Sequence, residues 1–227
     1  QIKNNKGLVV EQYEPYFETG FAYLAAPDDA NLARIKLQYD VLGRNTQINY
    51  DDGTFEKVEF TAWKQKNYDR NDTVIDSDWY SNRNSPDPAG SEPTDKDERA
   101  AWLAAKHYDT PQVLEMDSLG RMFLRKEDLG SSTLDTRFEY DLFGRRVQTT
   151  DPRGLITTYK YNLIPPPKDT EDEPAPLVSD SPDAGKRFLL NDIAQKPHRR
   201  WNSRGFLYRH EYDELQRPIE LWVTPSG

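Results

Sequence analysis

Three histidines are the first side chains in this 227-residue sequence that could support catalysis or metal binding. His107, His198 and His210 lack the close spacings that place two histidines on one metal ion. His210 alternates with Tyr208 and Tyr212, which favours a position on the face of a β-strand. The chain has no cysteine, so thiol nucleophiles and thiolate metal sites are excluded.

An acidic cluster between positions 69 and 78 is the second candidate. A calcium loop of the EF-hand type needs Gly at its sixth position and Glu at its twelfth. Counted from Asp69, those positions hold Val74 and Tyr80, so the pattern does not fit. We therefore expect turn and helix-cap roles for these side chains, and we predict no metal site. The cluster consists of Asp69, Asn71, Asp72, Asp76 and Asp78.

Other catalytic patterns are missing from the sequence. It contains no Gly-x-Ser-x-Gly elbow and no phosphate-binding loop, and its 39 acidic residues single out no carboxylate pair. We predict that the chain is not an enzyme and holds no cofactor.

A basic cluster lies beside Trp201 in the sequence and consists of His198, Arg199, Arg200, Arg204 and Arg209. One interpretation is that it contacts an acidic partner. The preferred interpretation is that these side chains flank a strand and are solvated.

The composition favours a sheet over a compact globule. Only 35% of the residues are hydrophobic, whereas 12% are aromatic, and aromatic residues suit half-buried pleated surfaces. The formal net charge of −9 argues against nucleic-acid binding through bulk charge. No run reaches the length of a membrane span, and the first residues do not resemble a secretory signal. Because the chain does not begin with Met, we expect an excised piece or a processed product.

An internal repeat of the form Tyr-Asp-x-x-Gly-Arg is the strongest signal in the sequence. A second turn follows about ten residues after several of the first turns, and the full period of 21 residues separates Asp192 from Asp213. The predicted turn residues are Tyr39, Asp40, Gly43, Arg44, Gly53, Asp117, Gly120, Arg121, Tyr140, Asp141, Gly144, Arg145, Asp151, Gly154, Asp192, Gly205, Tyr212, Asp213 and Arg217.

The residue types at these turns have separate physical roles. Asp at the first position accepts a hydrogen bond from the backbone N–H two residues later, and Gly at the fourth adopts a left-handed conformation without a steric penalty. A type I turn followed by such a Gly joins two antiparallel strands with a bulge. We expect each Arg to pair with a turn Asp of the neighbouring repeat. The sequence predicts a mainly β fold, a meander of hairpins in a curved antiparallel sheet over 1–227.

Two stretches interrupt the repeat. Residues 85–107 combine an acidic, proline-rich loop with a short helix at 97–106, capped by Thr94 or Asp95 and packed through Trp102 and Leu103. Residues 164–184 contain six prolines among charged residues and are predicted to form an exposed, extended loop.

Several stretches resemble the RHS or YD-repeat family, and within it the segment found in B components of insecticidal Tc toxin complexes and related virulence-plasmid-type proteins. The resemblance covers nearly the whole chain, and the proline-rich stretch is its main departure, because another repeat unit is expected there. The telling stretches are 13–17 (YEPYF), 52–55 (DGTF), 60–63 (FTAW), 71–80 (NDTVIDSDWY), 117–121 (DSLGR), 183–187 (DAGKR) and 201–205 (WNSRG).

The resemblance implies a function by architecture. Such repeats coil into a hollow β-shell that encloses a toxic or unfolded polypeptide cargo. It implies a secreted or cell-surface protein whose partners are flanking repeat segments or a toxin subunit, together with the enclosed cargo. The cargo-releasing protease core of full-length relatives has no match here. Two alternatives stay open, namely a carbohydrate- or surface-binding β module and, less favoured, a carbohydrate-active enzyme.

Overall fold

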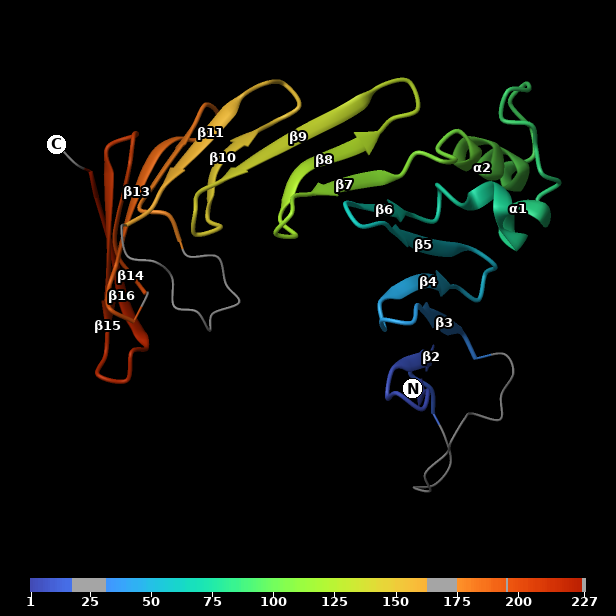
Figure 1. Ribbon diagram of the computed structural model, residues 1–227, viewed down its shortest axis with the longest axis horizontal. Helices are drawn as coiled ribbons and strands as arrows, with labels where there is room; N and C mark the ends of the chain where they lie inside the picture. Colours follow the sequence, from blue (N-terminus) through green and yellow to red (C-terminus); the bar gives the residue numbers. More distant parts are fainter. Residues whose placement is uncertain (18–31, 163–174, 195, 226–227) are drawn as a thin grey trace. The chain divides into compact units, whose positions relative to one another are not determined.

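The strands of this chain follow one another in the sheet in the order of the sequence. The computed structural model describes residues 1–17, 32–162, 175–194 and 196–225, and within these ranges it forms sixteen strands in the order β1 to β16 (Figure 1). The antiparallel meander predicted from the repeat is confirmed. The strands are β1 (Ile2–Lys3), β2 (Val9–Tyr13), β3 (Arg34–Tyr39), β4 (Asn45–Asn49), β5 (Phe55–Phe60), β6 (Lys64–Tyr68), β7 (Gln112–Met116), β8 (Met122–Asp128), β9 (Thr133–Tyr140), β10 (Arg146–Thr150), β11 (Ile156–Lys160), β12 (Val178–Ser181), β13 (Gly185–Asn191), β14 (Pro197–Asn202), β15 (Phe206–Tyr212) and β16 (Pro218–Pro225).

The chain divides into two compact units. Unit 1 comprises Gln1–Gly120 and Arg125–Leu134, and unit 2 comprises Arg121–Leu124 and Asp135–Gly227. The prediction of a single repeat region over 1–227 stays a prediction.

A β-bulge accompanies five of the described hairpin turns. The register shifts at the last residues before the turn in the pairs β1–β2, β3–β4, β9–β10, β13–β14 and β15–β16. This is the geometry expected when a type I turn is closed by one residue in the left-handed conformation. The extra residue in the bulge gives each hairpin a fixed register, so the alternation of side chains between the two faces is also fixed.

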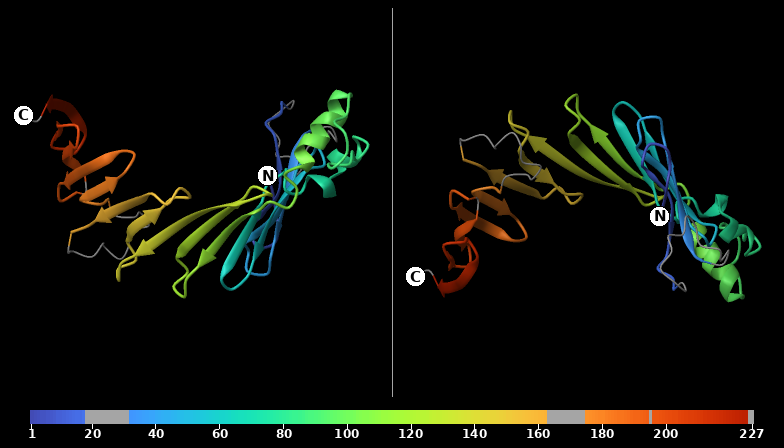
Figure 2. Two further views of the ribbon diagram at one scale, coloured as in Figure 1. Left: turned by 90° about the horizontal axis from the view of Figure 1, so that it is seen from above. Right: turned by 90° about the horizontal axis from the view of Figure 1, so that it is seen from below.

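A helical insertion lies between β6 and β7 in unit 1. It contains a 3₁₀ turn η1 (Val74–Asp76) and the helices α1 (Asp78–Ser81) and α2 (Lys96–Ala105). Figures 1 and 2 show both helices beyond the ends of the neighbouring strands. The carboxylate of Asp95 accepts hydrogen bonds from the first turn of α2, which confirms the helix and one of its two predicted caps. The turn η1 and the helix α1 were not predicted.

The buried core of the insertion is small. Ala101, Ala105, Val74 and Tyr80 form one cluster, and Trp102 is also buried. The prediction that Leu103 packs the helix is wrong, since 41% of its surface is exposed. The helix instead turns its alanines inward, because their small side chains allow η1 and α1 to approach closely.

Most strand residues are half-buried, and deep burial in the sheet is rare. Among the described sheet residues, the buried hydrophobic side chains are those of Tyr68, Leu124 and Phe138. Every residue of β16 is exposed. The strands are therefore held mainly by backbone hydrogen bonds and cross-strand side-chain pairs, as the low hydrophobic content suggests.

Only part of the predicted proline-rich loop, 164–184, lies within the described residues. Its first part, 164–174, lies outside them. The later residues Val178–Ser181 form β12, which pairs with β11 and β13, so this part of the prediction is wrong. Val178 pairs across β13 with Phe188, and this cross-strand contact favours a strand over a solvated loop.

Candidate functional site

The turn at Asp141 shows how a repeat turn is built. Oδ1 of Asp141 accepts hydrogen bonds from the backbone N–H groups of Phe143 and Arg145, both at 2.9 Å. The N–H of Gly144 donates to the carbonyl of Asp141 at 3.0 Å, and Gly144 has φ +81°. Nε of Arg145 donates to Oδ2 of Asp141 at 2.7 Å. One aspartate therefore closes the turn and anchors the arginine that follows it.

The same backbone pattern recurs at the other predicted turns. In these turns Oδ1 of the aspartate accepts hydrogen bonds from backbone N–H groups two and four residues later. Both bonds are present at Asp40, Asp151 and Asp192, and the bond four residues later is present at Asp213. Gln216 takes the place of Gly in the last turn and still adopts φ +61°. The predicted glycines with positive φ are Gly43, Gly53, Gly120, Gly144, Gly154 and Gly205.

Three arginines of the repeat pair with the aspartate of their own turn. The contacts join Arg44 to Asp40 at 2.7 Å, and the equivalent residues at Asp141 and Asp213 at 2.7 and 2.6 Å. The expected pairing with the neighbouring repeat is wrong for these three turns. In each of these turns the backbone N–H of the aspartate donates to the carbonyl of the arginine. This bond holds the two residues side by side, so the guanidinium lies next to the carboxylate of the same turn. Arg121 does reach the next turn, where Nη1 donates to the carbonyl of Asp141 at 3.4 Å.

Before three of the turns, a tyrosine joins two neighbouring strands. Its hydroxyl donates to the carbonyl of the first residue of the preceding strand, a contact that spacing alone did not predict. A tyrosine at position 161, after β11, makes the same contact. The bonds run from Tyr39 to Val9 (2.8 Å), Tyr140 to Met122 (2.6 Å), Tyr161 to Arg146 (2.9 Å) and Tyr212 to Pro197 (2.9 Å).

The turn carboxylates are stabilised in their charged form. Burial alone would raise the pKa of Asp141, but hydrogen bonds from the backbone and guanidinium of Arg145 outweigh burial and lower the pKa. The N–H of Arg217 is the largest cause of the lowered pKa of Asp213. Such aspartates are fixed acceptors, not proton donors, and this favours a structural role over acid–base catalysis.

One further turn of the same type was missed, and so was one turn of a different type. In the first, Asn4 accepts the N–H groups of Lys6 and Leu8 through Oδ1, and Gly7 has φ +79°. In the second, Asp128 accepts the N–H of Gly130, but this glycine with φ +78° is the third residue of the turn and not the fourth. The Asn-x-x-Gly spacing at residue 4 was a readable signal.

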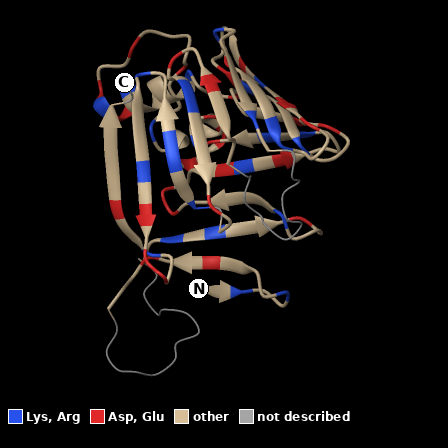
Figure 3. Cartoon of the chain, turned by 90° about the vertical axis from the view of Figure 1, so that its left-hand side faces the viewer, with Lys and Arg blue, Asp and Glu red and all other residues tan. Residues whose placement is uncertain are grey.

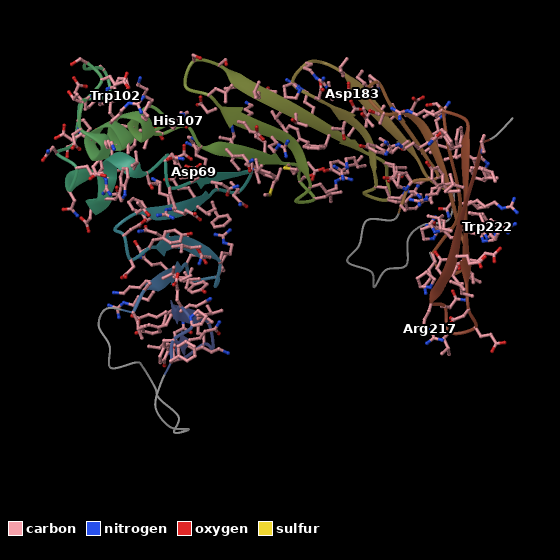
Figure 4. The ribbon with its side chains drawn as sticks, turned by 180° about the vertical axis from the view of Figure 1, so that it is seen from behind. Asp69, Trp102, His107, Asp183, Arg217 and Trp222 are labelled. Carbon is pink, nitrogen blue, oxygen red and sulfur yellow. The ribbon has the colours of Figure 1, made fainter. Side chains whose placement is uncertain are left out.

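The acidic cluster of unit 1 borders an open groove of about 670 Å³ that includes Asp69, Asp72 and His107. Figure 4 labels Asp69, which begins the helical insertion, and His107, which follows α2 near its end. The carboxylate of Asp72 accepts from the N–H of Asp69 at 2.8 Å and from the hydroxyl of Thr110 at 2.8 Å. Asp69 in turn accepts the N–H groups of Asn71 and Asp72. These carboxylates tie the two ends of the insertion together, and the described residues contain no group of side chains arranged to hold a metal ion.

Gly53 connects the insertion to the sheet. Its carbonyl accepts the N–H of Asp78 at 3.2 Å, and a Cβ placed on Gly53 would lie 2.7 Å from Cβ of Asp78. The neighbouring Thr54 is buried, and its Oγ1 accepts a hydrogen bond from Nε of Arg70 at 2.7 Å. The glycine predicted for turn geometry thus also permits the close approach of α1.

A second groove, of about 650 Å³, lies within unit 2 on β12 to β15. Its lining includes Arg187, Arg200, Arg204 and Tyr208. Arg200 and Arg204 belong to the basic cluster seen in the sequence, whereas Arg209 does not line this groove and pairs with a glutamate on its own strand at 2.7 Å. Figure 3 shows blue bands of Lys and Arg along the strands nearest the C-terminus.

His210 is half-buried on β15. Burial, followed by the charge of Arg200, lowers the pKa of His210, and its Nε2 has no hydrogen-bond partner among the described residues. A neutral histidine on the face of a strand matches the position expected from its alternation with Tyr208 and Tyr212.

Comparison with known proteins relates this chain to others through its fold. No family model matches, and no curated protein matches the sequence. A crystal structure of TcdB2-TccC3 matches 98% of this chain and 10% of its own, at 22% identity and a TM-score of 0.69. A Photorhabdus luminescens Tc holotoxin pore carrying a TccC3 mutation matches 97% of this chain and 10% of its own, at 23% identity and a TM-score of 0.70. This chain therefore has the fold of a segment that makes up about a tenth of those chains. Among the described residues, no helix is long and apolar enough to cross a membrane.

Proposed function

We propose that this chain is a wall segment of an RHS-type β-shell in a component of a toxin complex, and that it has no catalytic role of its own. The observation that carries the proposal is the fold likeness to Tc toxin chains over 98% of the sequence. In this proposal the chain is the YD-repeat part of a B-component-like protein, and the full-length protein is secreted.

The construction of the sheet supports a structural role. Asp and Arg pairs close three of the hairpins, and tyrosine hydroxyls join β3, β9 and β15 to the strands that precede them. The described strands have little core of their own, and β16 exposes Ile219, Leu221 and Val223. Unpaired strand edges favour pairing with further strands. A sheet with fixed turns and open edges is suited to extension by flanking repeat segments or by a partner toxin subunit.

The proposed shell encloses a polypeptide cargo, and enclosure can be tested by limited proteolysis of the full-length protein. Peptides from the cargo should appear only after the sheet is unfolded in guanidinium chloride, because the wall excludes a folded protease. The same cargo sequence expressed alone is the control and should be cut at once. Equal cleavage rates in the native protein and in the isolated cargo would exclude enclosure.

Carbohydrate binding is the second candidate function, and exposed aromatic rings favour it. Trp222 on β16 exposes 50% of its surface, with the guanidinium of Arg209 5.8 Å from its ring (Figure 4 labels Trp222). A glycan array with the chain tests this candidate. Binding lost in Trp222→Ala but kept in Trp63→Ala, whose ring is 57% exposed, would support it. An array without binding would leave the shell as the better account.

A further inference from the structure

The groove of unit 2 gathers three arginines at one place. Leu189 on β13 pairs with Arg200 on β14, and Arg200 pairs with Tyr208 on β15. Arg187 is two residues from Leu189 and so projects from the same face. Arg204 joins the lining from the turn between β14 and β15. The register of three neighbouring hairpins therefore determines the position of the three guanidinium groups.

These three arginines differ from the other cations of the sheet. Arg44, Arg145 and Arg217 are paired with turn carboxylates. Within the part of the chain that the structure describes, Arg187, Arg200 and Arg204 form no ion pair. All three are exposed.

Among the described residues that line the groove, Asp183 is the one carboxylate, and it is paired with a cation outside the groove. Its Oδ2 lies 2.6 Å from Nη2 of Arg153, which does not belong to the described lining. The described lining therefore carries an excess of positive charge, although the whole chain has a net charge of −9.

Apolar and aromatic surface lies between the charges. Leu189 is half-buried, and the ring of Tyr208 lies 5.5 Å from the guanidinium of Arg200. Pro176, Ala184, Phe188 and Trp201 also belong to the lining. A volume of about 650 Å³ is in the range of sites that take a small ligand or a few side chains.

We propose that this groove binds an acidic segment of a partner polypeptide, in which carboxylates alternate with apolar side chains. The planar guanidinium fork binds carboxylates through two parallel hydrogen bonds. Because the rest of the chain is acidic, an acidic partner is repelled from most of the surface and attracted to this groove. The apolar lining gives a peptide side chain a place to dock, which a free phosphate or a sulfated sugar does not require. This role goes beyond the proposed wall function and does not depend on it.

The test uses the chain itself and a defined probe. The probe is a fluorescein-labelled synthetic peptide of alternating Glu and Leu, titrated by fluorescence anisotropy at low salt and at high salt. We expect Arg200→Gln to weaken binding by about tenfold or more, as for the loss of a charged hydrogen bond. Arg199→Gln is the matched control, because it removes the same charge from the next residue on the opposite face of β14. High salt should weaken binding to the unmodified chain.

Arg200→Lys separates geometry from charge. It keeps the charge but loses the fork, so binding should fall between that of the unmodified chain and that of Arg200→Gln. Circular dichroism and thermal unfolding check that each variant folds. The proposal is overturned if the peptide does not bind, or if Arg199→Gln weakens binding as much as Arg200→Gln. It is also overturned if inorganic phosphate or a sulfated oligosaccharide displaces the peptide while an acidic competitor peptide does not.

Discussion

Replacing Gly53 by alanine should detach the helical insertion from the sheet of unit 1. Gly53 has φ +81°, and its added Cβ would meet Cβ of Asp78 at 2.7 Å and the backbone nitrogen of Trp79 at 3.2 Å. Gly43 is the matched control in the same unit. It also has φ +81°, but its added Cβ would meet only Cδ1 of Leu8, at 3.7 Å.

The expected magnitudes follow from these two environments. Both variants bear the cost of alanine in the left-handed conformation, about 1–2 kcal/mol. Gly53→Ala also forces the start of α1 away from the turn, and overpacking of this kind costs about 1–3 kcal/mol. The free energy of unfolding of unit 1 should therefore fall by about 1–3 kcal/mol more in Gly53→Ala than in Gly43→Ala.

Hydrogen exchange followed by mass spectrometry is the appropriate assay, because it reports opening of the insertion separately from the strands. Exchange should accelerate across η1 and α1 in Gly53→Ala and remain close to that of the unmodified chain there in Gly43→Ala. Equal exchange in the two variants would refute the reasoning, since it would mean that the two glycines are required only for their conformation.

Three further perturbations test other contacts. Asp141→Ala leaves the buried guanidinium of Arg145 without its carboxylate, so the free energy of unfolding measured in urea should fall by about 3 kcal/mol. A fall close to zero would contradict the anchoring role of Asp141. Tyr212→Phe removes the hydroxyl that donates to the carbonyl of Pro197 and should cost about 1 kcal/mol in the same assay, with unchanged stability as the contrary result. The pKa of His210 is lowered from 6.5 in the folded chain by burial and a nearby arginine, so the unfolded state binds the proton more readily and stability should fall as the pH drops below 6.5. His210→Leu should remove that part of the pH dependence, and melting temperatures measured from pH 7.5 to 5 check it.

The hairpins were predictable because each turn is encoded locally. Asp, Gly and Arg at fixed spacing determine a short loop, and the strands between turns need no distant partner to be recognised. The strand order could therefore be deduced, since consecutive hairpins place each strand beside its successor. The cap of α2 was predictable for the same reason, because Asp95 acts on the next three residues.

Contacts across strands were harder to predict. Spacing does not show that Tyr140 reaches the carbonyl of Met122, or that Gly53 faces Asp78, because both depend on register and on the approach of a separate segment. The arginine pairing was misjudged because the spacing in the sequence does not show which carboxylate lies nearest each guanidinium. The basic cluster was visible in the sequence, yet its division between two faces required the pairing of β13, β14 and β15.

The enclosure of one face of the sheet can be measured directly, because the chain has no cysteine of its own. In the full-length protein freed of other cysteines, Arg199→Cys and Arg200→Cys place single thiols on opposite faces of β14. Each variant is reacted with a small maleimide and with a maleimide on a large polyethylene glycol. The account predicts that both thiols react with the small reagent and that only one reacts with the large reagent. Equal reaction of both thiols with the large reagent would contradict the wall.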